Sequence, residues 1–369
     1  MAGLYIHIPY CHSKCFYCDF YSTPNIENMS QYIDVLLIEL KLRIAEIKNN
    51  ISTIYIGGGT PSILPIKLLQ KIHYGLSEFV DVQKLDEFTI EANPEDITPE
   101  WVKSINKLGI NRVSMGIQSF DNCELRAINR RHSSEEAYTA IDILRQYGMT
   151  NISGDLIYGL PGQNIDSWKY SLDKLMSLRL PHFSAYLLSY EPGTRLYARL
   201  MAGKIKEASE ELVSEMYQYL IAEAYNNGYD HYEISNFSIS GKAAIHNSNY
   251  WKDLPYLGIG VSAHSFDGKT RKYNPSNIKK YISQLKQAKC VYEIEIEDAN
   301  TRHNEYIIIS LRTSKGIDLK FYQQHFGFDI EKIAKPYIDS GQMILSDTHL
   351  AIAENSMLIS DRIMLDFIR

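Results

Sequence analysis

The chain has 369 residues, of which 45% are hydrophobic and 22% charged, and its formal net charge is −6. This length fits one large domain and a small one, and the acidic balance excludes a general nucleic-acid binder, which normally carries a basic excess. No apolar run approaches the ~20 residues that span a bilayer, and no signal peptide is visible at the N-terminus.

The first predicted element is a short strand, residues 3–8 (GLYIHI), which Pro9 ends. The loop after it carries Cys11, Cys15 and Cys18 in the spacing C-x3-C-x2-C, three of the five cysteines in the chain. A loop can wrap three thiolates around one metal centre, and soft thiolates select zinc or iron–sulfur. This clustering indicates a reducing cytoplasm rather than a disulfide framework.

Three interpretations of this loop compete. Scattered free cysteines would match the spacing by chance only about once in a thousand. A structural zinc ion needs a fourth ligand, for which His7 or His12 is available, but the sequence lacks a second C-x2-C pair. A [4Fe–4S] cluster with three protein ligands keeps one iron open for a substrate or cofactor. This third interpretation is favoured because the spacing, with Tyr17 before the last cysteine, resembles the radical S-adenosylmethionine (SAM) superfamily.

Strand-length and helix-length segments alternate from here to residue 190. Strands are predicted at 51–56, 86–92, 110–117, 150–157 and 182–188, and helices at 30–48, 65–79, 98–108, 121–147 and 164–178. Alternation of this kind means parallel β/α units joined by right-handed crossovers. Six units suit either a doubly wound sheet or an incomplete barrel, and both place ligands at the C-terminal ends of the strands.

The alternation stops after residue 190. The elements predicted next are a helix at about 207–227, a strand at 229–234, an irregular region at 235–275 and a helix at 276–289. The last part, about 300–369, has the short helices and strands of a small α+β domain. We therefore predict three parts, namely residues 1–235, a connecting region 236–299, and residues 300–369.

Polar and glycine residues lie at or after the ends of these strands. Residues 57–61 (GGGTP) lack side chains at three positions, which lets a ligand approach the backbone or simply makes a tight turn. Glu91 can accept two ribose hydroxyls, or act as a capping or solvated residue. Arg130 can bind a carboxylate bidentately, or satisfy Asp155 in a structural ion pair. Because parallel strands bring such ends together, a shared pocket that includes Gln118 is the better interpretation.

Six motifs follow one another in the order YIHIPYCHSKCFYCDF, IYIGGGTPS, EANPE, RVSMGIQSF, INRRH and GDLIYGLPGQ. Their order resembles the oxygen-independent coproporphyrinogen III oxidase family, strongly over residues 1–190 and more loosely beyond. The resemblance implies a radical SAM partial (β/α)6 TIM-like barrel with a small α+β C-terminal domain. It also implies a [4Fe–4S] cluster on the three cysteines, with SAM on its open iron. By motif position, the implied SAM-binding residues are Tyr5, Tyr17, Gly58, Gly59, Thr60, Glu91, Gln118, Arg130 and Asp155.

The chain departs from the oxidase pattern in two places, and both departures resemble the HemW branch of heme chaperones. Oxidases carry a further cysteine two residues after the third, where this chain has Phe20. The first cysteine, Cys11, leaves no room before it for the extra N-terminal segment of the oxidases. Residues 246–251 (HNSNYW) are also similar to the HNxxYW signature of that branch.

The resemblance implies that this motif binds heme. A histidine beside aromatic rings could ligate heme iron and stack on a porphyrin. His246 is the first candidate for the axial ligand and His264 the next, whereas the alternative is a hydrogen-bonded His246 in a loop over the barrel mouth. The implied heme-binding residues are His246, Asn247, Tyr250 and Trp251.

Two function classes follow. The favoured one is a heme chaperone that binds heme, a [4Fe–4S] cluster and SAM and delivers heme to heme proteins such as respiratory enzymes. The alternative is a radical SAM coproporphyrinogen III oxidase, which decarboxylates propionates oxidatively in porphyrin biosynthesis. The expected partners are heme and heme-receiving proteins and no nucleic acid, while peripheral membrane association and a homodimer are left open. No catalytic residue is assigned.

Overall fold

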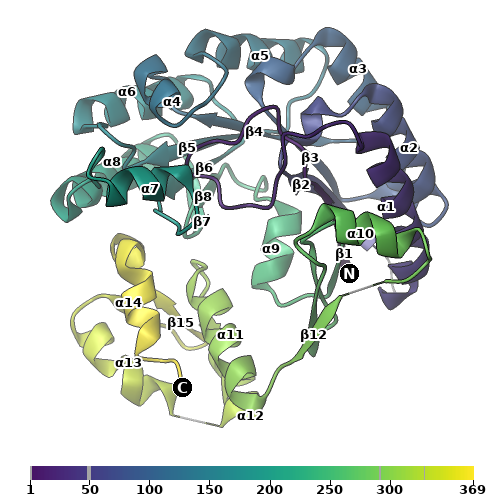
Figure 1. Ribbon diagram of the computed structural model, residues 1–369. Coiled ribbons are helices and arrows are strands. Elements are labelled where there is room, and N and C mark those ends of the chain that lie inside the picture. The colour runs from purple at the N-terminus through teal and green to yellow at the C-terminus, as the bar shows by residue number, and fades with distance from the viewer. Residues whose placement is uncertain (1, 48–50, 291, 328) are drawn as a thin grey trace.

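Six parallel strands in sequence order form the wall of an open barrel, and helices cover its outside (Figure 1). The computed structural model describes residues 2–47, 51–290, 292–327 and 329–369. The wall strands are β1 (Ala2–Ile8), β2 (Ile51–Gly58), β3 (Glu87–Ala92), β4 (Arg112–Gln118), β5 (Ile152–Tyr158) and β6 (His182–Leu187). The predicted partial (β/α)6 barrel is therefore confirmed, and the doubly wound alternative is not the fold.

The covering helices follow the strands as the periodicity predicts. They are α1 (Met29–Arg43), α2 (Ile66–Ser77), α3 (Pro99–Lys107), α4 (Asn122–Ala127), α5 (Ser134–Gln146) and α6 (Ile165–Ser177). Short 3-10 turns are η1 (Ile44–Glu46), η2 (Pro61–Ile63), η3 (Val82–Lys84) and η4 (Pro94–Asp96). Local capping sets their ends: the Thr98 side chain accepts the Trp101 amide at 3.1 Å, and Pro99 starts α3.

The single helical region predicted at 121–147 is two helices. Asn129 has φ 63°, in the left-handed region, which ends α4 and turns the chain before Ser133 caps α5. This break matters for the site, because it leaves Arg130 outside both helices, free to reach into the barrel.

Further strands extend the wall at both edges into a 12-stranded sheet. Beside β6 lie β8 (Asn236–Ser238) and β7 (Asp230–Glu233), both antiparallel. Beside β1 lies β9 (Tyr256–Ile259), which is parallel to it, followed by β10 (His264–Phe266), β11 (Thr270–Tyr273) and β12 (Glu293–Ile296). The prediction that 235–275 is irregular is wrong, because strands of three or four residues are too short to show a periodic signal.

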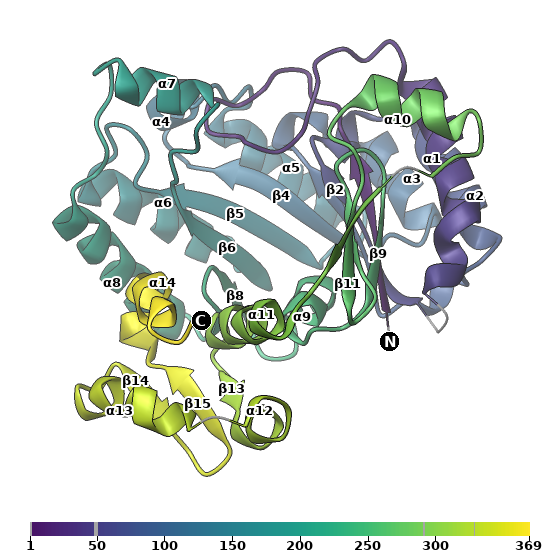
Figure 2. The same ribbon diagram turned by 60° about the horizontal axis from the view of Figure 1, so that its bottom comes forward.

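Four more helices lie between β6 and β12 in the sequence. They are α7 (Arg195–Met201), α8 (Glu210–Asn226), α9 (Ile245–Trp251) and α10 (Ile278–Leu285), of which α7 and α9 were not predicted. Helix α9 contacts β1 and β2 and sits at the end of the barrel where the strands begin, here called the floor. The loop after β1 lies at the opposite end, here called the mouth, as Figure 2 shows.

The C-terminal part forms a small α+β unit below the floor (Figure 2). It consists of α11 (Ala299–Leu311), β13 (Ile317–Asp318), α12 (Leu319–Phe326), α13 (Ile330–Asp339), β14 (Met343–Leu345), β15 (His349–Ile352), η5 (Glu354–Ile359) and α14 (Ser360–Leu365). Its sheet is antiparallel in the order β13-β15-β14. The domain boundaries at 235 and 299 stay predictions. Within the described ranges, every helix is too short or too polar to cross a membrane.

Candidate cofactor site inside the barrel

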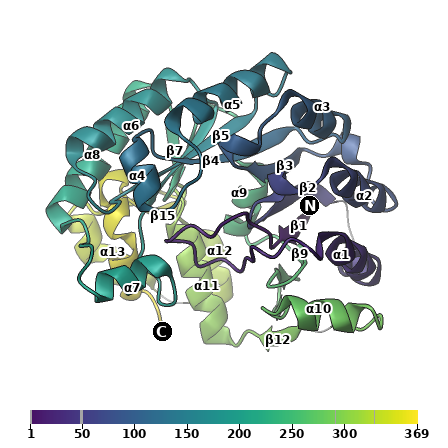
Figure 3. The same cartoon turned by 45° about the horizontal axis from the view of Figure 1, so that its top comes forward.

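A cavity of about 470 Å³ runs from the loop after β1 through the barrel to α9. Figure 3 shows this loop, in purple, crossing the inside of the ring of strands. The volume lies within the ~300–1,000 Å³ typical of small-molecule sites. Most of the predicted SAM and cluster residues line it: Cys11, Cys15, Tyr17, Cys18, Gly58, Gly59, Thr60, Glu91, Gln118, Arg130 and Asp155.

The three cysteines face this cavity from one closed loop. The backbone of Thr23 closes the loop onto its beginning, donating to Pro9 O at 2.7 Å and accepting from Cys11 N at 3.1 Å. Burial raises the pKa of the Cys11 thiol, and it raises the pKa of the Cys18 thiol to about 11. A thiolate in this setting therefore needs a neighbouring cation, which iron would supply.

The loop does not gather its sulfurs around a single point. Among the described residues, no group of three His, Cys, Asp or Glu side chains is placed to hold one metal ion. A zinc ion requires ligands at ~2.0–2.3 Å from one centre, whereas in a [4Fe–4S] cluster each thiolate binds a different iron. Three soft thiols lining one cavity thus fit the cluster better than zinc.

Arg130 lies beside the cysteine loop. Its Nη2 donates to Asn93 Oδ1 at 2.7 Å and to Gly116 O at 2.5 Å, and its Nη1 is 3.6 Å from Cys15 Sγ. The alternative ion pair with Asp155 does not form among the described residues. The guanidinium is therefore placed to offset negative charge at the sulfur and at a ligand next to it.

The glycine turn after β2 is tightly packed against its own chain. A Cβ on Gly58, where φ is 115°, would lie 2.7 Å from the His7 ring, and one on Gly59 would lie 2.7 Å from Tyr10 O. Substitution here would disturb the cysteine loop directly. The turn also presents Thr60, whose hydroxyl is 3.4 Å from Cys11 Sγ.

Two carboxylates project into the cavity. Glu91 accepts the Tyr55 hydroxyl at 2.8 Å and the Gly58 amide at 3.0 Å, while Asp155 accepts long bonds from Ser114 (3.4 Å) and Ser153 (3.5 Å). Burial raises the pKa of Glu91 to about 7 and that of Asp155 to about 6. Each carboxylate oxygen has two acceptor sites, so Glu91 can still accept ribose hydroxyls with its present partners in place.

Gln118 and the two predicted tyrosines have different environments. Gln118 lines the cavity with φ 67°, next to a register shift between β4 and β5. A non-glycine residue in this region is strained, and such strain is concentrated at ligand sites. Tyr17 lines the cavity, whereas Tyr5 does not. The Tyr5 hydroxyl is 3.0 Å from His7 Nδ1, and the Tyr5 ring stacks on Tyr55.

The HNxxYW motif is helix α9, at the floor rather than over the mouth. His246 is 1% exposed, with Nδ1 at 2.9 Å from Thr53 Oγ1 and Nε2 at 2.8 Å from the Tyr250 hydroxyl. Burial lowers its pKa to about 3. Both ring nitrogens are thus engaged, and one bond must break before His246 can ligate iron.

The other candidates of this group have different environments. Asn247 lines the cavity, whereas the indole Nε1 of Trp251 is buried without a hydrogen-bond partner among the described residues. His264 is exposed on β10 and packs edge-on against Tyr273. Of the two candidate heme ligands, His246 is therefore buried and His264 is exposed.

The sequence did not single out several groups that line the cavity floor. They are Arg112, Ser184, His182 and Asn236, and Tyr55 holds Glu91 nearby. Arg112 could have been predicted from the sequence, because it is a charged residue on a predicted buried strand, and Asp155 was selected by the same criterion.

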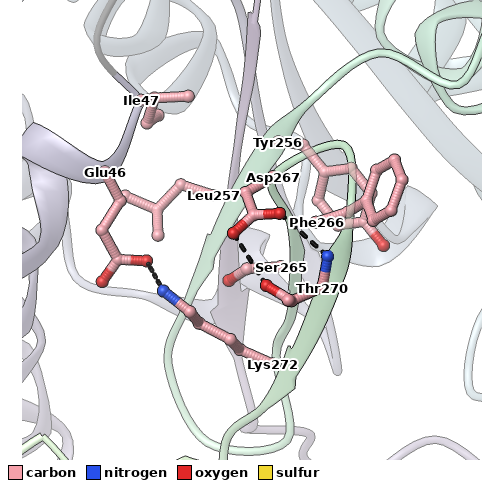
Figure 4. Close-up of a pocket in the computed structure, with 9 residues that line it drawn as sticks. All are labelled: Glu46, Ile47, Tyr256, Leu257, Ser265, Phe266, Asp267, Thr270 and Lys272. Atoms are coloured by element: carbon pink, nitrogen blue, oxygen red, sulfur yellow. Dashed lines mark hydrogen bonds and ion pairs between the residues drawn. The ribbon is translucent and has the colours of Figure 1, made fainter. Parts of the chain in front are cut away.

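A second hollow lies outside the barrel between η1 and the β9–β11 strands (Figure 4). It measures about 10 Å³, and the Lys272–Glu46 ion pair (2.7 Å) crosses it. This is room for about one water molecule, so it is no candidate for a ligand site.

Comparison with known proteins agrees with this geometry. The model of the radical SAM superfamily matches residues 5–175. Heme chaperone HemW of Bacillus subtilis (strain 168) is 31% identical, with 98% of each chain covered, and heme chaperone HemW of Lactococcus lactis subsp. lactis (strain IL1403) is 34% identical over 89% of this chain and 86% of the relative. The chain belongs to the HemW family.

The HemW fold is shared with a solved oxidase. Coproporphyrinogen III oxidase (HemN) from Escherichia coli superposes with a TM-score of 0.85, covering 99% of this chain and 89% of the other. The identity is 24%, so the likeness concerns the fold alone. The HemW relatives match both the barrel and the C-terminal unit.

Proposed function

We propose that the protein is a heme chaperone that binds heme, a [4Fe–4S] cluster and SAM, and passes heme to heme proteins such as respiratory enzymes. The observation that carries the proposal is the match over 98% of the chain to a relative named heme chaperone HemW. Phe20 supports it, because it stands where oxidases have a further cysteine and is 65% exposed at the cavity mouth.

Residues of this chain would hold the cofactors as follows. Cys11, Cys15 and Cys18 would ligate the cluster, which supplies one-electron chemistry and an open iron position when bound. Arg130 would offset charge beside Cys15, and Glu91 would accept hydroxyl groups of SAM. The heme ligand stays a prediction, with His246 requiring a rearrangement of its two hydrogen bonds and His264 already exposed.

Anaerobic reconstitution followed by two separate assays tests the proposal. The protein should bind heme stoichiometrically, seen as a defined Soret band, and should convert little or no coproporphyrinogen in the presence of SAM and reductant. Robust conversion without specific heme binding would replace the chaperone by the oxidase. Transfer of bound heme to an apo-cytochrome, followed by its absorption spectrum, tests delivery itself.

A further inference from the structure

Arg112 is a buried cation without a carboxylate partner. It begins β4, lines the floor of the cavity and is 2% exposed. Among the described residues no Asp or Glu forms an ion pair with it, and its Nε has no hydrogen-bond partner. An arginine this deeply buried is normally paired, since an unpaired buried charge is costly.

The groups around Arg112 do not neutralise it. Its Nη2 lies 3.4 Å from Nδ1 of His182, which also bonds Ser153 at 2.7 Å and, through Nε2, the Tyr232 hydroxyl at 2.8 Å. Burial, and then the charge of Arg112, hold the pKa of His182 well below its usual range. The neighbour of the guanidinium is therefore a neutral ring.

The two cavity carboxylates lie farther towards the mouth. In the sheet register Arg112 pairs with Thr89, whereas Glu91 is level with Ser114 and Asp155 with Gly116. These positions are two and four residues along β4, and neither carboxylate forms an ion pair with Arg112, although its charge favours the ionised form of both. Glu91 also keeps its own partners, Tyr55 and Gly58.

The acid on the opposite side of the floor is already engaged by other groups. Asn247 of α9 lines the cavity there. Glu87, the first residue of β3, is turned to the α9 backbone and accepts the amides of Ile245 at 2.6 Å and His246 at 3.4 Å. The floor thus offers a guanidinium and an uncharged amide to whatever enters from the mouth.

We propose that this floor is a carboxylate subsite, in which Arg112 binds the carboxylate arm of a ligand whose body extends towards the cysteine loop. A carboxylate matches the planar guanidinium fork and its single charge, and the floor lacks the several donors that a phosphate requires. The arm has two sources: a propionate of heme, in which case the subsite rests on the proposed function, or a small organic acid, in which case it stands alone.

Nuclear magnetic resonance of arginine-15N-labelled protein tests the subsite. The Arg112 Nε–H resonance is identified by its loss in R112K and is followed during titration with sodium butyrate or, at equal ionic strength, with butyramide. We expect butyrate to move this resonance and butyramide to leave it unchanged. An Arg112 resonance that neither acid nor porphyrin moves, or that butyramide moves equally, would overturn the subsite.

A second experiment distinguishes a heme propionate from a small organic acid as the source of the carboxylate. Zinc protoporphyrin IX and its dimethyl ester are titrated by fluorescence against wild type, R112Q and N247D. If a propionate is the arm, the free acid binds wild type at least tenfold more tightly than the ester, and both variants lose this ratio. Equal binding of acid and ester, with butyrate still moving the Arg112 resonance, assigns the subsite to a small acid.

The N247D variant is the control for misfolding. It adds a competing carboxylate and leaves Arg112 in place, so it still tests the subsite if R112Q fails to fold. If wild-type protein does not bind heme, the chaperone proposal is wrong, and the butyrate titration alone then decides whether the carboxylate subsite exists.

Discussion

At the scale of single residues, the five cysteines divide into three that face the cavity and two that do not. Replacing Cys11, Cys15 or Cys18 by Ala should abolish the ~4 irons per chain expected for the cluster, because each thiolate holds a separate iron. The measurement is iron content and visible absorption after anaerobic reconstitution.

The other two cysteines are matched controls. Cys123 is exposed on α4 and Cys290 follows α10, and neither lines the cavity. Cys123→Ala and Cys290→Ala should retain full iron. One tightly bound zinc ion and no iron in the wild type would contradict the cluster.

The carboxylate of Glu91 makes stability depend on pH. Its folded-state pKa, about 7, lies above the ordinary 4.5, so between these values the folded state holds a proton that the unfolded state has lost. The free energy of unfolding of cofactor-free protein should therefore fall as pH rises from 4.5 to 7, by up to ~1.4 kcal/mol per pH unit for this group.

Glu91→Gln removes this titration. Urea unfolding at several pH values should show a shallower decline for the variant than for wild type, although Asp155, with its pKa raised to about 6, keeps part of the slope in both. Identical slopes would mean that water in the cavity keeps the pKa of Glu91 near its usual value.

At the scale of elements, helix α9 is anchored to the floor through His246. His246→Ala should cost ~2–4 kcal/mol of unfolding free energy, because it leaves a cavity and removes the partners of the Thr53 and Tyr250 hydroxyls. Thermal unfolding measures this, and iron content should be unchanged because the cluster loop lies at the mouth.

Asn247 is the matched control on the same helix. It lines the cavity, and none of its side-chain atoms is a buried group that lacks a partner, so Asn247→Ala should cost under ~0.5 kcal/mol. If the two variants are equally stable, α9 is not held by His246, and a loss of heme in His246→Ala could then be assigned to ligation.

At the scale of the whole molecule, a buried ion pair joins the β9–β11 extension to the barrel. Arg43 and Glu39 of α1 are each 2% exposed and 2.7 Å apart. Arg43 also donates to Ser265 at 2.9 Å, and Glu39 accepts the Gly260 amide at 2.8 Å. Residues more than 200 positions apart thus share one network.

Arg43→Met should cost ~3–5 kcal/mol, because it leaves Glu39 as an uncompensated buried charge. Lys41→Met is the control, since Lys41 lies on the same helix in an exposed pair with Glu78 and should contribute under ~1 kcal/mol. Chemical unfolding of both variants measures the difference, and equal costs would show that the network does not hold the extension.

The alternation of strands and helices and the position of the cluster loop could be predicted from the sequence, whereas the choice of a barrel over a doubly wound sheet came from the family resemblance. Long strands and helices carry periodic patterns and local caps, such as Thr98 and Pro99 at α3, that depend on neighbours in the chain. The three cysteines share one loop, so their spacing alone indicated the donor set. Asp155 was found because a charge on a buried strand is exceptional.

The edges of the sheet and the place of the HNxxYW helix in the fold became visible only in three dimensions. Strands such as β9 have four residues and are stabilised by pairing with β1, some 250 positions away, so no local signal predicts them. The partners of His246, and the neutral His182 beside Arg112, likewise come from distant segments. Hydrogen bonding and burial are set by what folding brings together, which the order of residues along one strand or helix does not contain.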